Sequence, residues 1–214
     1  MRVLITGANR GIGRALYDVY VARGDDVIGT TRNQAPDGWL QLDVTDPASV
    51  SAMANQLKGE AIDLLICNAG VYLDKGYELG NGYTSNVWAD TFAANVTGVF
   101  LTIEALLSNL RAVGGKVAII SSQMGSSERA VGNAFAYRAS KAAALNLGRN
   151  LAIHLYPDVA VGIYHPGWVQ TDMGGAEADI TVDESSSGLL RRFDLLGPNT
   201  TGCFEMWNGE AMPY

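Results

Sequence analysis

The chain has 214 residues, of which 48% are hydrophobic and 17% are charged, a length and balance that allow one folded domain with a sizeable core. The formal net charge of −7 argues against binding to nucleic acids or anionic membranes. Two cysteines are too few for a disulfide framework and favour a reducing, cytoplasmic setting. No apolar run reaches the roughly 18 residues of a membrane span, and the strand expected at residues 1–6 leaves no room for a signal peptide before it.

Residues 2–6 are short, apolar and β-branched, which is typical of a buried parallel strand. A turn with the spacing Gly-x-x-x-Gly-x-Gly follows, and helical periodicity then continues until Gly24. Glycines let a backbone approach a ligand, and a helix N-terminus offers free N–H groups, so this arrangement predicts a phosphate cradle. The residues that we expect at a cofactor here are Gly7, Asn9, Arg10, Gly11, Ile12 and Gly13. A tight turn without a ligand is the alternative interpretation.

The second predicted strand, residues 26–31, bears on the choice of cofactor. A carboxylate about 20 residues after the glycines would bind the ribose hydroxyls of NAD, but positions 31–33 carry no acid, and Asp25 and Asp26 fall at the other end of the strand. Arg32 and Arg10 could instead hold the 2′-phosphate of NADP, because a guanidinium binds phosphate as a fork. We therefore predict NADP in preference to NAD, with solvated surface arginines as the alternative.

A third short strand is expected at residues 39–42 and runs into Asp43 and Val44. Thr45 can cap the helix predicted for residues 46–57. Asp43 could accept a hydrogen bond from an adenine amino group, or it could act as a cap itself.

Residues 62–67 predict another buried strand, which ends in Asn68, Ala69 and Gly70. Small residues at the carboxyl end of a strand suit the crevice where ligands bind in open α/β sheets. The Tyr- and Gly-rich loop over residues 72–83 is of a size that often carries function, with plain mobility as the alternative.

Two long helices are predicted in the middle of the chain. The first, residues 84–111, has an apolar face that Asn95 interrupts, so we expect Asn95 to pack between helices or to join a polar network. A strand over residues 116–120 ends in two serines, the second of which is Ser122. The second helix is expected over residues 133–155.

Tyr137 and Lys141 lie four residues apart on that second helix, which places their side chains on one face, one turn apart. A free tyrosine has a pKa of about 10, and a neighbouring ammonium favours the phenolate and lowers that pKa. The pair therefore predicts a tuned proton donor or acceptor. An exposed tyrosine and a solvated lysine would give the same short motif.

The last quarter of the sequence predicts a strand at residues 160–164, a short helix around 184–193 and a strand near 202–206. Residues 172–184 carry five acids and no base, which indicates a solvated loop or a lid over a pocket. The only two histidines, His154 and His165, have no Cys/His spacing that would indicate a metal site.

Six motifs occur in register along the chain: Thr6-Gly7-Ala8-Asn9-Arg10-Gly11-Ile12-Gly13, Asn68-Ala69-Gly70, Asn95, Ser122, Tyr137-x-x-x-Lys141 and Pro166-Gly167. In order and spacing they resemble the short-chain dehydrogenase/reductase family, and the resemblance covers essentially the whole chain. The run from His165 to Met173 looks most like the compact branch that includes C-factor-like and sniffer-type carbonyl reductases.

The resemblance implies one α/β domain over residues 1–214, with a Rossmann-type doubly wound parallel sheet of about seven strands and helices on both faces. It assigns catalysis to Asn95, Ser122, Tyr137 and Lys141. Ser122 would orient a carbonyl oxygen, Tyr137 would transfer the proton, Lys141 would lower the pKa of that tyrosine and bind the nicotinamide ribose, and Asn95 would hold a water. The other cofactor contacts implied are Asp43 and Val44 at the adenine, Asn68, Ala69 and Gly70 at the ribose, and Pro166, Gly167, Trp168, Val169 and Thr171 at the nicotinamide end.

The implied function is an NADP(H)-dependent oxidoreductase that interconverts a small-molecule carbonyl and an alcohol by hydride transfer. A cofactor-binding signalling or regulatory protein of the same fold is the alternative, and the intact catalytic set favours the enzyme. The family also implies a homodimer or homotetramer that packs through the two long helices.

Ser122 lies fifteen residues before Tyr137, slightly more than is usual for the family. We therefore expect the intervening loop to bulge and the substrate pocket to be open, lined by some of Gln123, Met124, Val131, Trp168 and the loop of residues 72–83.

Overall fold

The computed structural model describes residues 1–214 and contains one seven-stranded parallel sheet in the order β3-β2-β1-β4-β5-β6-β7. The strands are β1 (Arg2–Ile5), β2 (Asp26–Thr31), β3 (Leu40–Gln41), β4 (Leu64–Cys67), β5 (Lys116–Ile120), β6 (Ala160–His165) and β7 (Phe204–Met206). The doubly wound α/β architecture is therefore confirmed.

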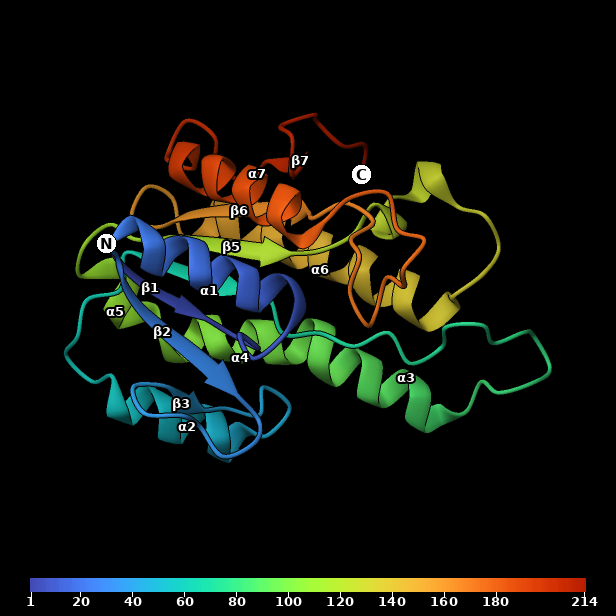
Figure 1. Ribbon diagram of the computed structural model, residues 1–214, viewed down its shortest axis with the longest axis horizontal. Coiled ribbons are helices and arrows are strands. Elements are labelled where there is room, and N and C mark those ends of the chain that lie inside the picture. Colours follow the sequence, from blue (N-terminus) through green and yellow to red (C-terminus); the bar gives the residue numbers. More distant parts are fainter.

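Helices cover both faces of the sheet (Figure 1). They are α1 (Gly11–Arg23), α2 (Pro47–Gln56), α3 (Ser85–Phe92), α4 (Gly98–Ala105), α5 (Leu107–Arg111), α6 (Phe135–His154) and α7 (Val182–Leu195). Side chains alternate along each strand: Val3 and Ile5 of β1 pack with α1 and α7, whereas Leu4 packs with α2, α4, α5 and α6 on the other face. No helix is long and apolar enough to cross a membrane.

The long helix expected over residues 84–111 is broken into pieces. A π-helical turn, η1 (Ala93–Thr97), separates α3 from α4, and Leu106 separates α4 from α5. Apolar residues continue at helical spacing through these breaks. The prediction of one continuous helix from that spacing is therefore wrong. Two 3₁₀ turns, η2 (Gln123–Gly125) and η3 (Ser127–Arg129), occupy the expected loop before α6.

Caps at two helices also differ from the prediction. The N-cap of α2 is Asp46, which accepts a hydrogen bond from the Ala48 N–H at 2.9 Å, while Thr45 donates its hydroxyl to Asp43 instead. Helix α7 begins two residues earlier than expected, because Thr181 and Glu184 form a reciprocal capping box. Part of the predicted acidic loop is therefore the first turn of α7.

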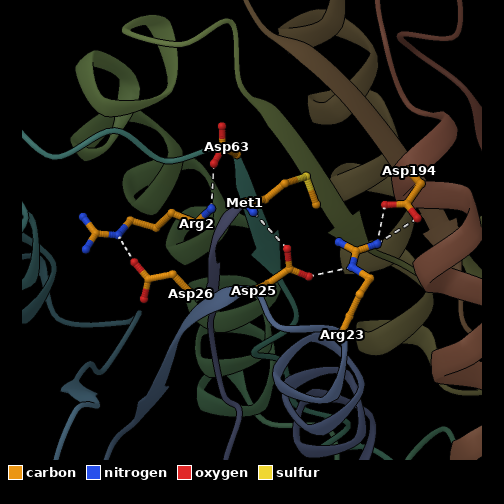
Figure 2. Close-up of polar contacts among 7 residues, drawn as sticks. All are labelled: Met1, Arg2, Arg23, Asp25, Asp26, Asp63 and Asp194. Carbon is orange, nitrogen blue, oxygen red and sulfur yellow. Dashed lines mark hydrogen bonds and ion pairs between the residues drawn. The ribbon is translucent and has the colours of Figure 1, made fainter.

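The amino ends of the strands are held by ion pairs (Figure 2). Asp25 accepts from the amino group of Met1 at 2.9 Å and from Arg23 at 2.6 Å, and Arg23 also binds Asp194 at the end of α7. Arg2 pairs with Asp26 at 2.7 Å. Both acids at the start of β2 therefore lie at the opposite edge of the sheet from the glycine turn, as the sequence predicted.

The carboxyl edge of the sheet contains the topological switch point. The chain moves outward from β1 through β2 to β3 and then returns to the other side of β1 with β4. In such sheets a crevice opens outside the carboxyl ends of the two central strands. In Figure 1 this edge lies to the right, where the arrow of β5 points.

Candidate functional site

The glycine turn between β1 and α1 is shaped for close approach of a ligand. Gly7 and Gly11 adopt φ angles of +67° and +55°, which favour glycine. A Cβ at Gly13 would collide with the Gly7 carbonyl oxygen and the Asn68 amide. The N-cap of α1, Arg10, makes no side-chain cap hydrogen bond, so the helix end is left for a phosphate. These features fit a dinucleotide pyrophosphate. Asn9 and Ile12 belong to the same turn.

Residues 68–70 connect this turn to the rest of the site. The Asn68 side chain donates hydrogen bonds to the carbonyls of Thr6 and Gly7, each at 3.0 Å, so its amide holds the turn in place. A Cβ at Gly7 would lie 3.2 Å from Ala69 Cα, and a Cβ at Gly70 would lie 3.6 Å from Lys141 Nζ. The glycine turn and the predicted catalytic lysine are thus linked through three consecutive residues.

Asp43 follows β3 and is not a helix cap. Its Oδ1 accepts hydrogen bonds from the N–H and the hydroxyl of Thr45 at 2.9 and 2.7 Å. The Thr45 hydroxyl lowers the pKa of Asp43, and the charge of Arg32 acts in the same direction. Arg32 directly follows β2, and the pairing of Thr31 with Gln41 places it beside the chain that leads to Asp43. Val44 is buried, with its carbonyl against the position of Gly98 at the start of α4.

Tyr137, Lys141 and Ser122 come together where β5 meets the first turns of α6. All three are buried, and Lys141 Nζ lies 5.6 Å from the centroid of the Tyr137 ring. Lys141 Nζ donates a hydrogen bond to the Ile120 carbonyl at 3.0 Å. Ser122 Oγ accepts from the Met124 N–H at 3.1 Å, which leaves its own proton available as a donor. The predicted convergence of the tyrosine, lysine and serine is present.

Burial changes the titration of this pair. It raises the pKa of Tyr137 to about 12, and the Ser122 hydroxyl acts against this rise. Burial also lowers the pKa of Lys141 to about 8. For Tyr137, loss of solvent around the phenol is the largest of the effects on its pKa. A lowered tyrosine pKa, which we expect from the Lys141 ammonium together with the oxidised nicotinamide, stays a prediction.

Asn95 lies in the π-helical turn η1 and is fully buried. Its Nδ2 donates to the Val71 carbonyl at 2.9 Å and to Ser140 Oγ at 3.0 Å, and its Oδ1 accepts from the Val71 N–H at 2.8 Å. Both amide protons are used, so the side chain joins the polar network that was one of its two predicted roles. π turns often occur at functional sites.

The segment after β6 lies beside the glycine turn. Thr171 Cγ2 would be 3.4 Å from a Cβ at Gly11, and Arg10 forms an ion pair with Asp172 at 3.0 Å. The Pro166 carbonyl accepts from the Ser185 hydroxyl at 2.6 Å, and Gly167 has a φ of +92°. The indole of Trp168 donates to the Gly174 carbonyl at 3.0 Å, and Val169 is buried and pairs with Ile180. Thr171 and Asp172 thus place this segment against the glycine turn.

The short chain dehydrogenase family matches residues 1–180. The chain belongs to this family. Its members use NAD(P), and this protein is an oxidoreductase that acts on CH–OH and C=O groups. The architecture and family that the sequence predicted are both confirmed.

Particular relatives of this short-chain dehydrogenase support the narrower placement. It is 37% identical to the C-signal of Myxococcus xanthus over 76% of this chain and 99% of that protein. The NADPH-bound carbonyl reductase from chicken fatty liver is 31% identical with a TM-score of 0.90, over 100% of this chain and 98% of that one. The carbonyl reductase Sniffer of D. melanogaster is 25% identical with a TM-score of 0.92, over 100% and 99%.

Tyr72 and Asp74 of this dehydrogenase contact Tyr137. Both belong to the loop of residues 72–83 that we expected at the pocket from the sequence, but neither contact with Tyr137 was predicted. The Tyr72 ring stacks on the Tyr137 ring with centroids 4.3 Å apart. Asp74 accepts a hydrogen bond from the Tyr137 N–H at 3.3 Å. The one indirect signal is Ala134, the N-cap residue before α6, which has no side chain able to cap a helix. The free N–H groups of this helix end therefore need partners from elsewhere in the chain.

Surface cavities are open rather than enclosed. One of about 410 Å³ borders the outer side of the glycine turn and includes Arg10, Gly11 and Thr171. A larger one of about 590 Å³ lies at the other end of α6, around Arg149, and contains none of the predicted site residues. No cluster of His, Cys, Asp and Glu side chains could hold a metal ion.

Proposed function

We propose that this short-chain dehydrogenase is an NADP(H)-dependent carbonyl reductase in which Tyr137 is the general acid for reduction and the general base for oxidation. The observation that carries this proposal is the burial of Tyr137, Lys141 and Ser122 together, with Lys141 beside Gly70. Asn68 and Ala69, which precede Gly70, contact the glycine turn. The NADPH-bound carbonyl reductase fold shared with the chicken protein supports it.

Each side chain has a distinct task in this proposal. The cofactor supplies the hydride. Ser122 donates its free hydroxyl proton to the carbonyl oxygen and orients the substrate. Tyr137 delivers a proton to the same oxygen, and a pKa raised to about 12 means that the phenol carries this proton before the reaction starts. Lys141 adds positive charge that favours the phenolate in the reverse direction and binds the nicotinamide ribose.

Asn95 is proposed to act through backbone groups rather than through its amide. Its side-chain protons are already donated to Val71 and Ser140, so a water that links Lys141 to solvent would bind elsewhere in the π turn.

The remaining contacts follow the edge of the sheet. The glycine turn, with Asn9 and Ile12, holds the pyrophosphate, Asp43 and Val44 meet the adenine, and residues 68–70 line the ribose. Arg32 and Arg10 bind the 2′-phosphate of NADP, for which Arg10 must leave Asp172. Pro166, Gly167, Trp168, Val169 and Thr171 hold the nicotinamide end.

The test is Tyr137→Phe. We expect it to abolish NADPH-dependent reduction across a panel of aldehydes and ketones, because the ring remains but the proton is lost, and to leave NADPH binding by fluorescence unchanged. Wild-type turnover in this variant would contradict the proposal.

A regulatory function is the second candidate, and similarity to the C-signal of Myxococcus xanthus favours it. It would gain support if the wild-type protein bound NADPH tightly and reduced no carbonyl in the same panel. We also propose a cytoplasmic protein that forms a homodimer or homotetramer through α3–α5 and α6; the exposed Trp88 and Phe100 on α3 and α4 support this assembly.

A further inference from the structure

The first turn of α6 is capped by a distant loop. Ala134, its N-cap, has a left-handed backbone (φ 49°) and no capping side chain. The Phe135 N–H donates to the Tyr83 hydroxyl at 3.2 Å, and the Ala136 N–H donates to Asp74 Oδ2 at 2.8 Å. The Tyr137 N–H donates to Asp74 Oδ1 at 3.3 Å. Three backbone donors that helix geometry leaves free are thus satisfied by two side chains from residues 72–83.

Asp74 is a carboxylate with 0% exposure, and none of the ion pairs in the protein includes it. A buried carboxylate is costly unless something balances it. Here the balance comes from the N-terminus of a 20-residue helix, where the helix dipole amounts to about half a positive charge.

The same loop also holds the side chain of Tyr137. Tyr72 stacks on the phenol ring at an interplanar angle of 21°. Asn95 fixes the start of the loop through the N–H and the carbonyl of Val71. The backbone and the ring of Tyr137 are therefore both positioned by one segment.

We propose that Asp74 is a positioning residue for Tyr137: it fixes the first turn of α6, and its negative charge opposes loss of the proton from the phenol. This inference rests on the proposed role of Tyr137 as proton donor. It implies that the loop of residues 72–83 sets the pH range of the enzyme as well as the shape of its site.

The charges and titratable groups around Tyr137 support this. Burial is the largest cause of the raised pKa of Tyr137; the Ser122 hydroxyl, after β5, acts against it, and Tyr72 and Asp74, from the loop, act in the same direction as burial. Lys141, on α6, lies 5.6 Å from the ring centroid, and His165, at the end of β6, is near enough for the charge of Lys141 to lower its pKa. Arg138, also on α6, acts on Tyr72. Asp74 is the one full negative charge among these groups.

The test compares Asp74→Asn with Tyr83→Phe, since both weaken the capping of the same turn but only the first removes a charge. The readout is the pH profile of kcat/KM for carbonyl reduction with NADPH. We expect the falling limb of Asp74→Asn to move to lower pH, because asparagine keeps an oxygen that can accept from the helix N–H groups but removes the negative charge that disfavours the phenolate. Tyr83→Phe should keep the wild-type limb, even where its kcat falls.

A second measurement requires no turnover and therefore separates this inference from the proposed function. Phenolate absorbance is titrated in the NADP⁺ complex of each protein, and the curve of the matching Tyr137→Phe variant is subtracted. The Tyr137 transition should come at lower pH in Asp74→Asn than in wild type.

Two results would overturn the inference. One is an Asp74→Asn variant with reduced kcat and an unmoved pH profile, which would make Asp74 a structural cap only. The other is an equal shift in Tyr83→Phe. If Asp74→Asn does not fold, Asp74→Glu takes its place. This variant keeps the negative charge and must therefore retain the wild-type pH profile. A shifted profile in Asp74→Glu would also overturn the inference.

Discussion

Arg32 is the side chain on which the proposed cofactor preference depends most directly. It follows β2, its charge reaches Asp43, and no carboxylate stands at positions 31–33 where NAD would need one. A guanidinium bound to a phosphate contributes a charge-assisted hydrogen bond of about 1.5–3 kcal/mol.

Arg32→Ala should therefore raise the KM for NADPH by roughly tenfold to a hundredfold and leave the KM for NADH nearly unchanged. Initial rates with both cofactors measure this directly. Arg149→Ala, at the far end of α6, is the matched control and should alter neither value. An equal rise in the KM values for NADPH and NADH would show that Arg32 does not bind the 2′-phosphate.

Among the secondary-structure elements, the π turn η1 shows how a buried amide can organise a helix junction. Asn95 bonds both polar groups of the Val71 backbone and so ties α3 and α4 to the start of the loop of residues 72–83. Its contact with Ser140 extends the network to α6.

Asn95→Ala should lower the free energy of unfolding by about 1–3 kcal/mol, because it leaves two partly buried backbone groups of Val71 and the buried Ser140 hydroxyl without this partner. Urea denaturation followed by circular dichroism gives the value. Asn150→Ala removes an exposed asparagine that bonds only Asn146 on α6, and it should change stability by less than about 0.5 kcal/mol. Equal effects of the two substitutions would contradict this account.

The strands and the glycine turn could be predicted because their signals are local: short apolar runs end in glycine or in small polar residues. The breaks at η1 and Leu106 could not be, since apolar residues continue at helical spacing across both. Asp74 was missed for a related reason. Its partner Ala136 is 62 residues away, and no local pattern marks one of the two acids in that loop as the cap of a distant helix.

For the molecule as a whole, stability should depend on pH through His165. This side chain is 4% exposed, its Nδ1 has no hydrogen-bond partner, and burial lowers its pKa to about 4 from an ordinary 6.5. The unfolded chain binds a proton on this histidine below about pH 6.5, whereas the folded protein does not until about pH 4. The free energy of unfolding therefore does not vary with pH through His165 above about pH 6.5. It decreases as the pH falls from about 6.5 toward 4, because only the unfolded chain takes up the proton in this range.

The free energy of unfolding should fall by up to about 3 kcal/mol across this window. His165→Asn removes the titrating group and should flatten the pH dependence between 6.5 and 4, whatever it does to the absolute value. His154→Gln, at the exposed end of α6, should keep the wild-type slope. Chemical denaturation at a series of pH values measures all three proteins, and a wild-type slope in His165→Asn would refute the prediction.

The strand order also governs how fast the chain can acquire its structure. β1 pairs with β2 on one side and with β4, some 60 residues later, on the other. Every ladder is parallel, and all of them except the pairing of β2 with β3 need a long crossover before the first contact forms. Such non-local topologies fold slowly. During synthesis on the ribosome, β1 can pair on both sides only after β4, which ends at residue 67, has emerged.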